Sequence, residues 1–191
     1  MRKLIALMHM SLDGFCAGPK SEMDWITLND GIFADAHAMI ETMGAAVYGR
    51  TTYGMLRGYW PAVLDKDDAD PAQRKHARWV ERSPKFTFSR TLTSSDWNNV
   101  HLFRDAGEML ELKKQEGAPM LIFGSPSLTH AFMALDVIDE YWLFQNPILL
   151  GEGIPVFRGQ SRTKLRLVEA KPFAGGVMRL HYAKQTIGES P

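Results

Sequence analysis

The sequence predicts an α/β protein with a largely parallel sheet that ends in an antiparallel hairpin. Short apolar segments alternate with segments of helical spacing along most of the chain, which is the order that parallel sheets require. The first apolar segment, residues 3–10, is nearly continuous, as expected of a buried strand. The last two segments flank Phe173-Ala174-Gly175-Gly176, a sequence typical of a hairpin turn.

The first half of the chain contains the clearest helix signals. Residues 29–42 place apolar side chains at helical spacing, and Asn29 or Asp30 can cap that helix. A strand over residues 45–48 leads into a short helix over residues 51–56. The sequence Tyr59-Trp60-Pro61 is expected to end that helix.

A helix over residues 71–82 is predicted next, with Pro71 in its first turn. The other predicted helices cover residues 105–116 and 127–134. The other predicted strands cover residues 86–88, 100–103, 120–123, 138–145, 165–170 and 177–184.

Composition predicts a soluble globular protein, with residues 1–191 forming a single domain. The chain has 45% hydrophobic residues and no formal net charge, from 22 basic and 22 acidic residues, so no global field favours nucleic acid or a membrane. No secretory leader and no apolar stretch of membrane-spanning length are recognised. Cys16 is the only cysteine, which excludes an intrachain disulfide and favours a cytoplasmic location.

Two strand ends share a pattern that suits phosphate binding. The strand over residues 45–48 runs into Gly49-Arg50-Thr51-Thr52, and the strand over residues 120–123 runs into Gly124-Ser125-Pro126-Ser127-Leu128. A glycine, a hydroxyl group and a helix start place backbone N–H groups around one point, and Arg50 adds a cation. Each turn alone is also ordinary helix-capping chemistry. Together they predict sites for two ends of an extended, multiply phosphorylated ligand, such as a dinucleotide.

Other common active-site patterns are missing from the sequence. There is no G-x-G-x-x-G after the first strand, no phosphate-binding G-x-x-x-x-G-K-[ST], no G-x-S-x-G and no H-E-x-x-H. The histidines are scattered without the spacing of metal ligands, so no metal site is expected. These absences disfavour hydrolase and metalloenzyme functions.

An ordered set of motifs resembles the dihydrofolate-reductase-like superfamily, and within it the reductase domain of the bifunctional riboflavin-biosynthesis deaminase–reductase. The resemblance covers about residues 3–184 and implies a three-layer fold with helices on both faces of the sheet. It is carried by residues 11–15, 48–53, 88–92, 124–128, 139–143 and 147–157. No zinc-binding H-x-E with P-C-x-x-C is present, so the deaminase half is not expected.

The resemblance implies an NADPH-dependent reductase. Gly49, Arg50, Thr51 and Thr52 would meet the cofactor phosphates, and Gly124, Ser125, Ser127 and Leu128 would lie against the pyrophosphate and the nicotinamide end. Ser89, Arg90 and Thr91 occupy the place where the family contacts the 2′-phosphate, and a guanidinium with two hydroxyls suits that dianion. Simple capping or a solvated strand end would explain the same residue types.

The resemblance places the substrate near Asp13 and Trp25. Asp13 is the candidate catalytic residue, because a carboxyl group there can orient the substrate or assist proton transfer; a turn-capping role is equally compatible with the sequence. Trp25 is the candidate substrate-binding residue, which can stack on a flat heterocycle or serve as a lid or dimer contact. The expected reaction is hydride transfer to a C=N or C=O carbon of a pterin-, pyrimidine- or ribosylaminopyrimidine-like compound.

One departure from the family pattern keeps a second function open. Phe123-Gly124-Ser125 stands where riboflavin-pathway reductases usually carry a glutamate and two glycines. A nucleotide-binding protein without turnover is therefore the main alternative, and a flavin-dependent enzyme is disfavoured by Ser89 and Arg90. The resemblance also implies a homodimer, for which the C-terminal hairpin offers Phe173, Val177 and Leu180.

Overall fold

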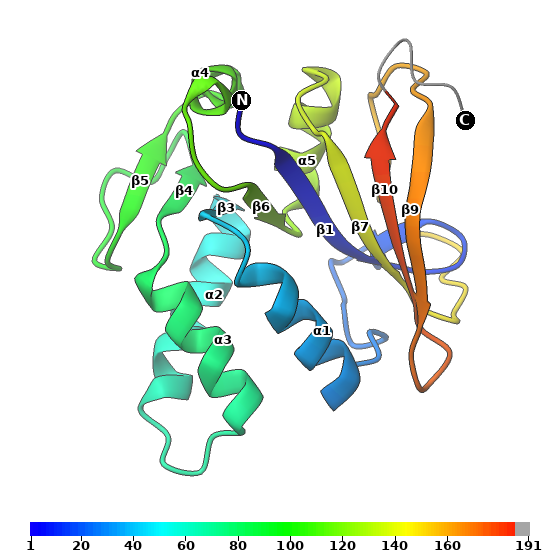
Figure 1. The fold of residues 1–191 in the computed structure, drawn as a ribbon, viewed down its shortest axis with the longest axis horizontal. Coiled ribbons are helices and arrows are strands. Elements are labelled where there is room, and N and C mark those ends of the chain that lie inside the picture. The colour runs from blue at the N-terminus through cyan, green and yellow to red at the C-terminus, as the bar shows by residue number, and fades with distance from the viewer. Residues whose placement is uncertain (186–191) are drawn as a thin grey trace.

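A computed structural model, which describes residues 1–185, shows a central sheet with helices on both faces (Figure 1). The strand order in this eight-stranded sheet is β5-β4-β3-β6-β1-β7-β10-β9, and β10 runs in the direction opposite to the other seven strands. The predicted largely parallel sheet is therefore confirmed. The strands are β1 (Leu4–Met10), β3 (Ala45–Gly49), β4 (Lys85–Phe88), β5 (Val100–Phe103), β6 (Met120–Phe123), β7 (Glu140–Gln145), β9 (Leu165–Pro172) and β10 (Met178–Lys184).

The helices cover the two faces of this sheet in two groups. Helices α1 (Asp30–Ile40), α2 (Arg50–Leu64) and α3 (Pro71–Arg82) pack on one face, where Ile5 and Leu121 are buried. Helices α4 (Met109–Lys114) and α5 (Pro126–Ala134) pack on the other. Alternate residues of each buried strand enter opposite cores, which explains why the strands read as continuous apolar runs. Among the described residues, no helix is both long and apolar enough to cross a membrane.

The C-terminal hairpin forms where the sequence predicts it. Strands β9 and β10 pair in antiparallel fashion, and Gly175 and Gly176 in the turn have φ angles of 83° and 79°. These left-handed values favour glycine, so the turn chemistry sets the register of the pair. Val177 is only 1% exposed and packs with Ile32 of α1, so it is a core residue and cannot serve as the apolar dimer contact expected from the sequence.

The helix after β3 is longer than predicted. It does not end at Tyr59-Trp60-Pro61 but continues through Pro61 to Leu64. Proline inside a helix removes one backbone hydrogen bond and strains the preceding turn. Packing offsets this cost, since Trp60 stacks on His76 of α3 with ring centroids 4.2 Å apart and Val63 is also buried.

Two further local structures differ from the sequence expectation. Strand β2 (Phe15–Ala17) pairs with β8 (Ile154–Pro155) in a small second sheet, and both are too short to show a periodic pattern. The helix expected over residues 105–116 is divided into a 3₁₀ turn, η1 (Ala106–Glu108), followed by α4. Asp105 and Glu108 form a reciprocal capping box at its start, which fixes where the turn begins.

Two histidines, the buried His76 and the partly buried His9, make the fold sensitive to acid. Burial lowers the pKa of His9 and that of His76 to about 4 each, well below the ordinary 6.5. The unfolded chain therefore binds more protons than the native protein between about pH 6.5 and pH 4. The stability contributed by the neutral imidazoles is present above pH 6.5 and is lost as the pH falls through that window.

We predict that acidification from about pH 7.5 to about pH 5 lowers the free energy of unfolding by about 2 kcal/mol for each of these histidines. Urea unfolding at both pH values measures this fall. The variant His76→Phe keeps a ring against Trp60. Its free energy of unfolding should fall by about 2 kcal/mol less than that of the wild type, because one of the two histidines is gone. His101→Phe is the control, because His101 is exposed on β5; an equal fall in wild type and His76→Phe would contradict the prediction.

Candidate functional site

The predicted site residues collect along one edge of the sheet. Strands β4, β3, β6, β1 and β7 are parallel, so the segments that follow them leave from the same carboxyl edge. Helix α2 leaves β3 over one face toward β4, and α5 leaves β6 over the other face toward β7. The chain thus diverges between β3 and β6, and such a switch point is where open α/β sheets bind ligands.

The two glycine turns meet at this switch point. The Gly49 N–H donates to Ser125 Oγ at 2.7 Å, and Ser125 Oγ donates to Thr52 Oγ1 at 2.9 Å. A Cβ on Gly49 would lie only 2.5 Å from Ser125 Oγ, so the contact requires glycine. The turns were expected to hold two ends of an extended ligand. Because they touch, the two turns form one shared surface.

Both helices that start here lack a side-chain cap. Neither Gly49 at α2 nor Ser125 at α5 makes a capping hydrogen bond to its own helix. Ser125 has a left-handed φ of 58°, which turns its hydroxyl across to β3. The first-turn N–H groups of both helices, and the positive ends of their dipoles, therefore face the shared surface. This arrangement favours an anion.

The side chains around this surface fit a phosphate ligand. Arg50, Thr51 and Ser127 are exposed, whereas Thr52 and Leu128 are partly buried. Gly124 has a φ of 54°, and a Cβ built on it meets nothing within 4 Å, so its backbone is open to a ligand. Thr129, a residue that the sequence analysis missed, donates to the Gly124 carbonyl at 2.9 Å and holds the turn in place.

The loop after β4 presents Arg90 and Thr91 at the same edge. Ser89 is buried, and its hydroxyl accepts hydrogen bonds from the Leu92 N–H at 2.9 Å and the Thr91 N–H at 3.3 Å. It therefore shapes the loop, while Arg90 and Thr91 are exposed beyond it. Arg104 was missed by sequence reasoning; its Nη1 donates to the carbonyls of Ser89 and Leu92. It adds a second guanidinium to this loop.

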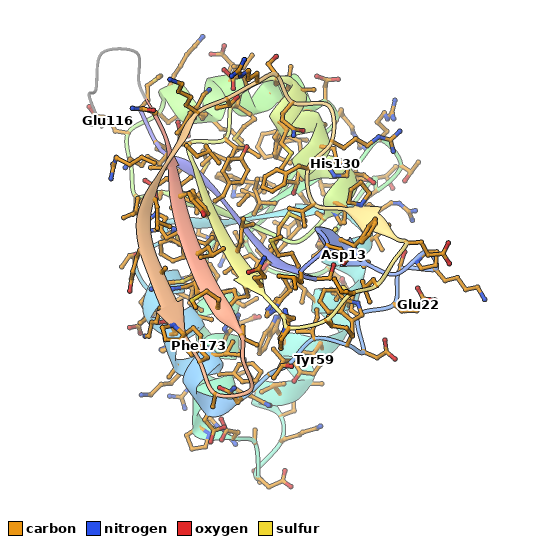
Figure 2. All side chains as sticks on the ribbon, turned by 90° about the vertical axis from the view of Figure 1, so that its right-hand side faces the viewer. Asp13, Glu22, Tyr59, Glu116, His130 and Phe173 are labelled. Carbon is orange, nitrogen blue, oxygen red and sulfur yellow. The ribbon has the colours of Figure 1, made fainter. Side chains whose placement is uncertain are left out.

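Asp13 lies at the other half of the edge, in the loop after β1 (Figure 2). Its carboxylate accepts hydrogen bonds from Ser11 Oγ at 2.6 Å, from the Gly151 N–H at 2.7 Å and from the Leu150 N–H. The Ser11 hydroxyl, and then the Gly151 N–H, lower the pKa of the Asp13 carboxyl. Asp13 is therefore an ionised group that joins two loops, and it is poorly suited to donate a proton at neutral pH.

Trp25 belongs to a loop that crosses the carboxyl end of β7. Its Nε1 donates to the Glu22 carbonyl at 3.0 Å, and its ring is partly exposed. Asn146 anchors this loop: its Oδ1 accepts from the Thr27 N–H at 2.9 Å, and its Nδ2 donates to the Phe144 carbonyl. Asn146 was missed by sequence reasoning, although a buried amide directly after an apolar strand is the kind of signal that can reveal such an anchor.

The α1 face of the sheet is incompletely covered near these loops. Phe123, Leu7 and Trp142 are neighbours across β6, β1 and β7, and all three are only partly buried. We call them the half-covered row. On the opposite face, the adjacent residues of β1, Ala6 and Met8, are fully enclosed. Incomplete burial at this level of β1 is therefore confined to the α1 face of the sheet.

Polar atoms without partners lie around the half-covered row. His9 Nδ1, His37 Nδ1 and Trp142 Nε1 are buried and have no hydrogen-bond partner within residues 1–185. His9 follows Leu7 on the same face of β1 and stacks on Phe144 with centroids 5.1 Å apart. Buried polar atoms are normally satisfied, so these atoms are free to form hydrogen bonds with a ligand. No cluster of three or more metal-ligating side chains occurs in the described part of the chain.

The strand order, the switch point and the hairpin define the dihydrofolate-reductase-like class of α/β proteins. Residues 2–178 match the family described as the RibD C-terminal domain, and the chain belongs to that family. Among its relatives, the uncharacterized protein YyaP of Bacillus subtilis is 30% identical over 185 residues, covering 95% of this chain and 94% of YyaP.

Solved structures share the fold at lower identity. A protein of Shewanella sp. PV-4 named for riboflavin biosynthesis has a TM-score of 0.73 and 21% identity, covering 96% of this chain and 99% of that one. The deaminase/5-amino-6-(5-phosphoribosylamino)uracil reductase of Thermotoga maritima has a TM-score of 0.67 and 16% identity, covering 96% of this chain but 57% of that one. Dihydrofolate reductase of Enterococcus faecalis, solved with NADP(H), has a TM-score of 0.64 and 14% identity over 96% of this chain and 97% of its own.

Proposed function

We propose that the protein is an NADPH-dependent reductase of a small pterin- or pyrimidine-like compound. The observation that carries this proposal is the contact between two uncapped helix N-termini at the β3/β6 switch point, beside Arg50. Family membership supports it, because the Thermotoga and Enterococcus proteins are reductases by name. The buried Cys16 fits a cytoplasmic location, which we propose as well.

The residues at the switch point and in the loop after β4 would contact different parts of the cofactor. The first-turn N–H groups after Gly49 and Ser125 would bind the pyrophosphate, and Arg50, Thr51 and Thr52 would complete its shell. Ser127 and Leu128 would lie along the nicotinamide half beside Gly124. Arg90 and Thr91 would contact the 2′-phosphate, with Ser89 and Arg104 holding their loop in shape. When bound, NADPH supplies the hydride that adds to a C=N or C=O carbon of the substrate, with a proton reaching the neighbouring nitrogen or oxygen.

The substrate would lie on the half-covered row, between α1 and the loop that carries Trp25. Asp13 would act as a positioning group rather than as the proton donor, because its carboxylate is ionised and is held by Ser11 and Gly151. Trp25 would close over the ring from the loop that Asn146 anchors. Exclusion of water by these groups would favour hydride transfer.

A non-catalytic nucleotide-binding function is the second candidate. Phe123 stands at the end of β6, where riboflavin-pathway reductases usually carry a glutamate. Its ring packs among aromatic rings, with its centroid 5.8 Å from that of Tyr48 and 6.2 Å from that of His76. This candidate predicts cofactor binding without NADPH oxidation by any pterin or pyrimidine.

A parallel titration with NADPH and NADH tests the cofactor assignment, with the fluorescence of the five tryptophans as readout. Binding of NADPH in preference to NADH supports it, and subsequent loss of NADPH absorbance with a substrate separates the reductase from the second candidate. If neither dinucleotide binds, the reductase function and the non-catalytic nucleotide-binding function are both rejected.

We predict that Arg90→Ala weakens NADPH binding by about tenfold or more and changes NADH binding by less than about twofold, because only NADPH carries the 2′-phosphate. The matched control is Arg82→Ala, which removes an exposed arginine at the opposite end of β4. The same fluorescence titration measures both variants. Equal losses for the two dinucleotides would place Arg90 outside the 2′-phosphate site.

We predict that Asp13→Asn leaves NADPH affinity within about twofold but lowers turnover by about tenfold or more, because the carboxylate positions the loops around the substrate. The rate of NADPH oxidation measures this effect. Glu116→Gln makes the same change of charge on the opposite side of the molecule and should leave the rate unchanged (Figure 2). If Asp13→Asn turns over at the wild-type rate, Asp13 has only a structural role in its turn.

We also propose that the protein is a homodimer. The outermost strand β9 supports this, since Leu167 and Val168 are 49% and 45% exposed there. Light scattering at micromolar concentration is expected to give about twice the 21.5 kDa chain mass. A mass of one chain would remove the proposal.

A further inference from the structure

We propose that the substrate is an uncharged, flat nitrogen heterocycle that carries no phosphate and lies on the half-covered row of Phe123, Leu7 and Trp142. This inference rests on the proposed reductase function and deepens it by naming the substrate class. It also separates this chain from the Thermotoga protein, whose name specifies a 5-phosphoribosyl compound.

The loops around the substrate half are acidic. Residues 11–30 follow β1, and residues 146–153 follow β7. Together these segments contain a single basic residue, the exposed Lys20. Their carboxylates are Asp13, Glu22, Asp24, Asp30 and Glu152. A phosphate dianion requires arginine or lysine side chains, or free backbone N–H groups, and like charges oppose its approach.

Two cations on strands β10 and β9 beside Trp142 are already paired with carboxylates. Arg179, which is 6% exposed, lies 5.7 Å from the Trp142 ring. Its Nη2 contacts Glu169 Oε2 at 2.6 Å, and its Nε lies 3.3 Å from Asp35 Oδ2. Lys171 contacts the other oxygen of Asp35 at 2.5 Å. A phosphate on the substrate would have to compete with these carboxylates for the two cations.

The free N–H groups and unpaired guanidinium groups lie at the other half of the edge. The uncapped starts of α2 and α5, with Arg50 and Arg90, surround the switch point. Among the described residues no carboxylate forms an ion pair with Arg50, Arg90 or Arg104. The edge is therefore divided into a phosphate-binding half and a half that disfavours phosphate, which matches a phosphorylated cofactor and an unphosphorylated substrate.

The unpartnered polar atoms indicate what the substrate offers instead. Trp142 Nε1 can only donate a hydrogen bond, so it calls for an acceptor such as a ring carbonyl or ring nitrogen. Burial keeps His9 neutral at pH 7, because it lowers the pKa of the imidazole to about 4. A neutral imidazole can donate or accept according to its tautomer. Neutral partners and partly exposed apolar rings together select an uncharged heterocycle with polar edges.

The test compares a matched pair of substrates. 5-Amino-6-(5-phosphoribosylamino)uracil and the same compound after phosphatase treatment are each mixed with the full chain and NADPH, and kcat/KM is measured from the loss of NADPH absorbance. We expect the dephosphorylated compound to have a kcat/KM at least about tenfold higher. Equal or higher kcat/KM for the phosphorylated compound would overturn the inference.

A charge-reversal variant tests whether the acidic loops cause the preference for the dephosphorylated compound. Asp24→Lys places a cation in the acidic loop, where Asp24 is exposed, and should raise kcat/KM for the phosphorylated compound by about threefold or more at low ionic strength. The gain should shrink as salt is added, and the dephosphorylated compound should be unaffected. Glu116→Lys makes the same change of charge on the opposite side of the molecule (Figure 2) and should alter neither compound. An equal gain in both variants would overturn the electrostatic argument.

Two further outcomes separate this inference from the proposed function. If NADPH binds but neither compound is turned over, the substrate inference is overturned and the non-catalytic second candidate is favoured, while the cofactor site stands. If NADPH does not bind, the proposed function fails, and the substrate inference fails with it.

Discussion

The hydrogen bond from the Gly49 N–H to Ser125 Oγ is the contact on which the geometry of the site depends. It joins turns that are 76 residues apart in the chain, at the point where α2 and α5 diverge. Glycine is required because a Cβ would occupy the place of the hydroxyl. Since that hydroxyl is engaged across the sheet, it does not cap α5. One interaction thus fixes the spacing of two helix ends and leaves their N–H groups available to an anion.

Most of the fold follows from local sequence, and the exceptions show where tertiary packing overrides it. The β6 strand occurs over the predicted residues because a strand buried on both faces is an apolar run with turn residues at its end. Helix α3 starts at Pro71 as expected, with Asp70 as its cap. Pro61 predicts a helix end, yet α2 continues through it, because burial of Trp60 against His76 outweighs the lost hydrogen bond. No local pattern reports such a contact between helices.

The candidate site likewise contains features that local sequence predicts and features that depend on tertiary structure. The glycine turns were predictable, because strand ends and helix starts are local features. That the turns touch was not, since it depends on β6 inserting between β3 and β1. The half-covered row was not predictable either, because Phe123, Leu7 and Trp142 become neighbours only through the register of three strands. Arg104 and Asn146 act through backbone groups of distant loops, which a search for chemical motifs does not detect.

The strand order also determines how charge is distributed along the site. Parallel strands send all their following loops to one edge, so the loops lie in the order of the strands. The β4 and β3 loops bring Arg90 and Arg50 to one half, and the β1 and β7 loops bring carboxylates to the other. The contact between Gly49 and Ser125 involves neither the β1 nor the β7 loop. Substitutions in those two loops can therefore change the charge of one half of the edge while the β3/β6 surface keeps its geometry. This independence would allow one fold to combine the proposed cofactor site with different substrates.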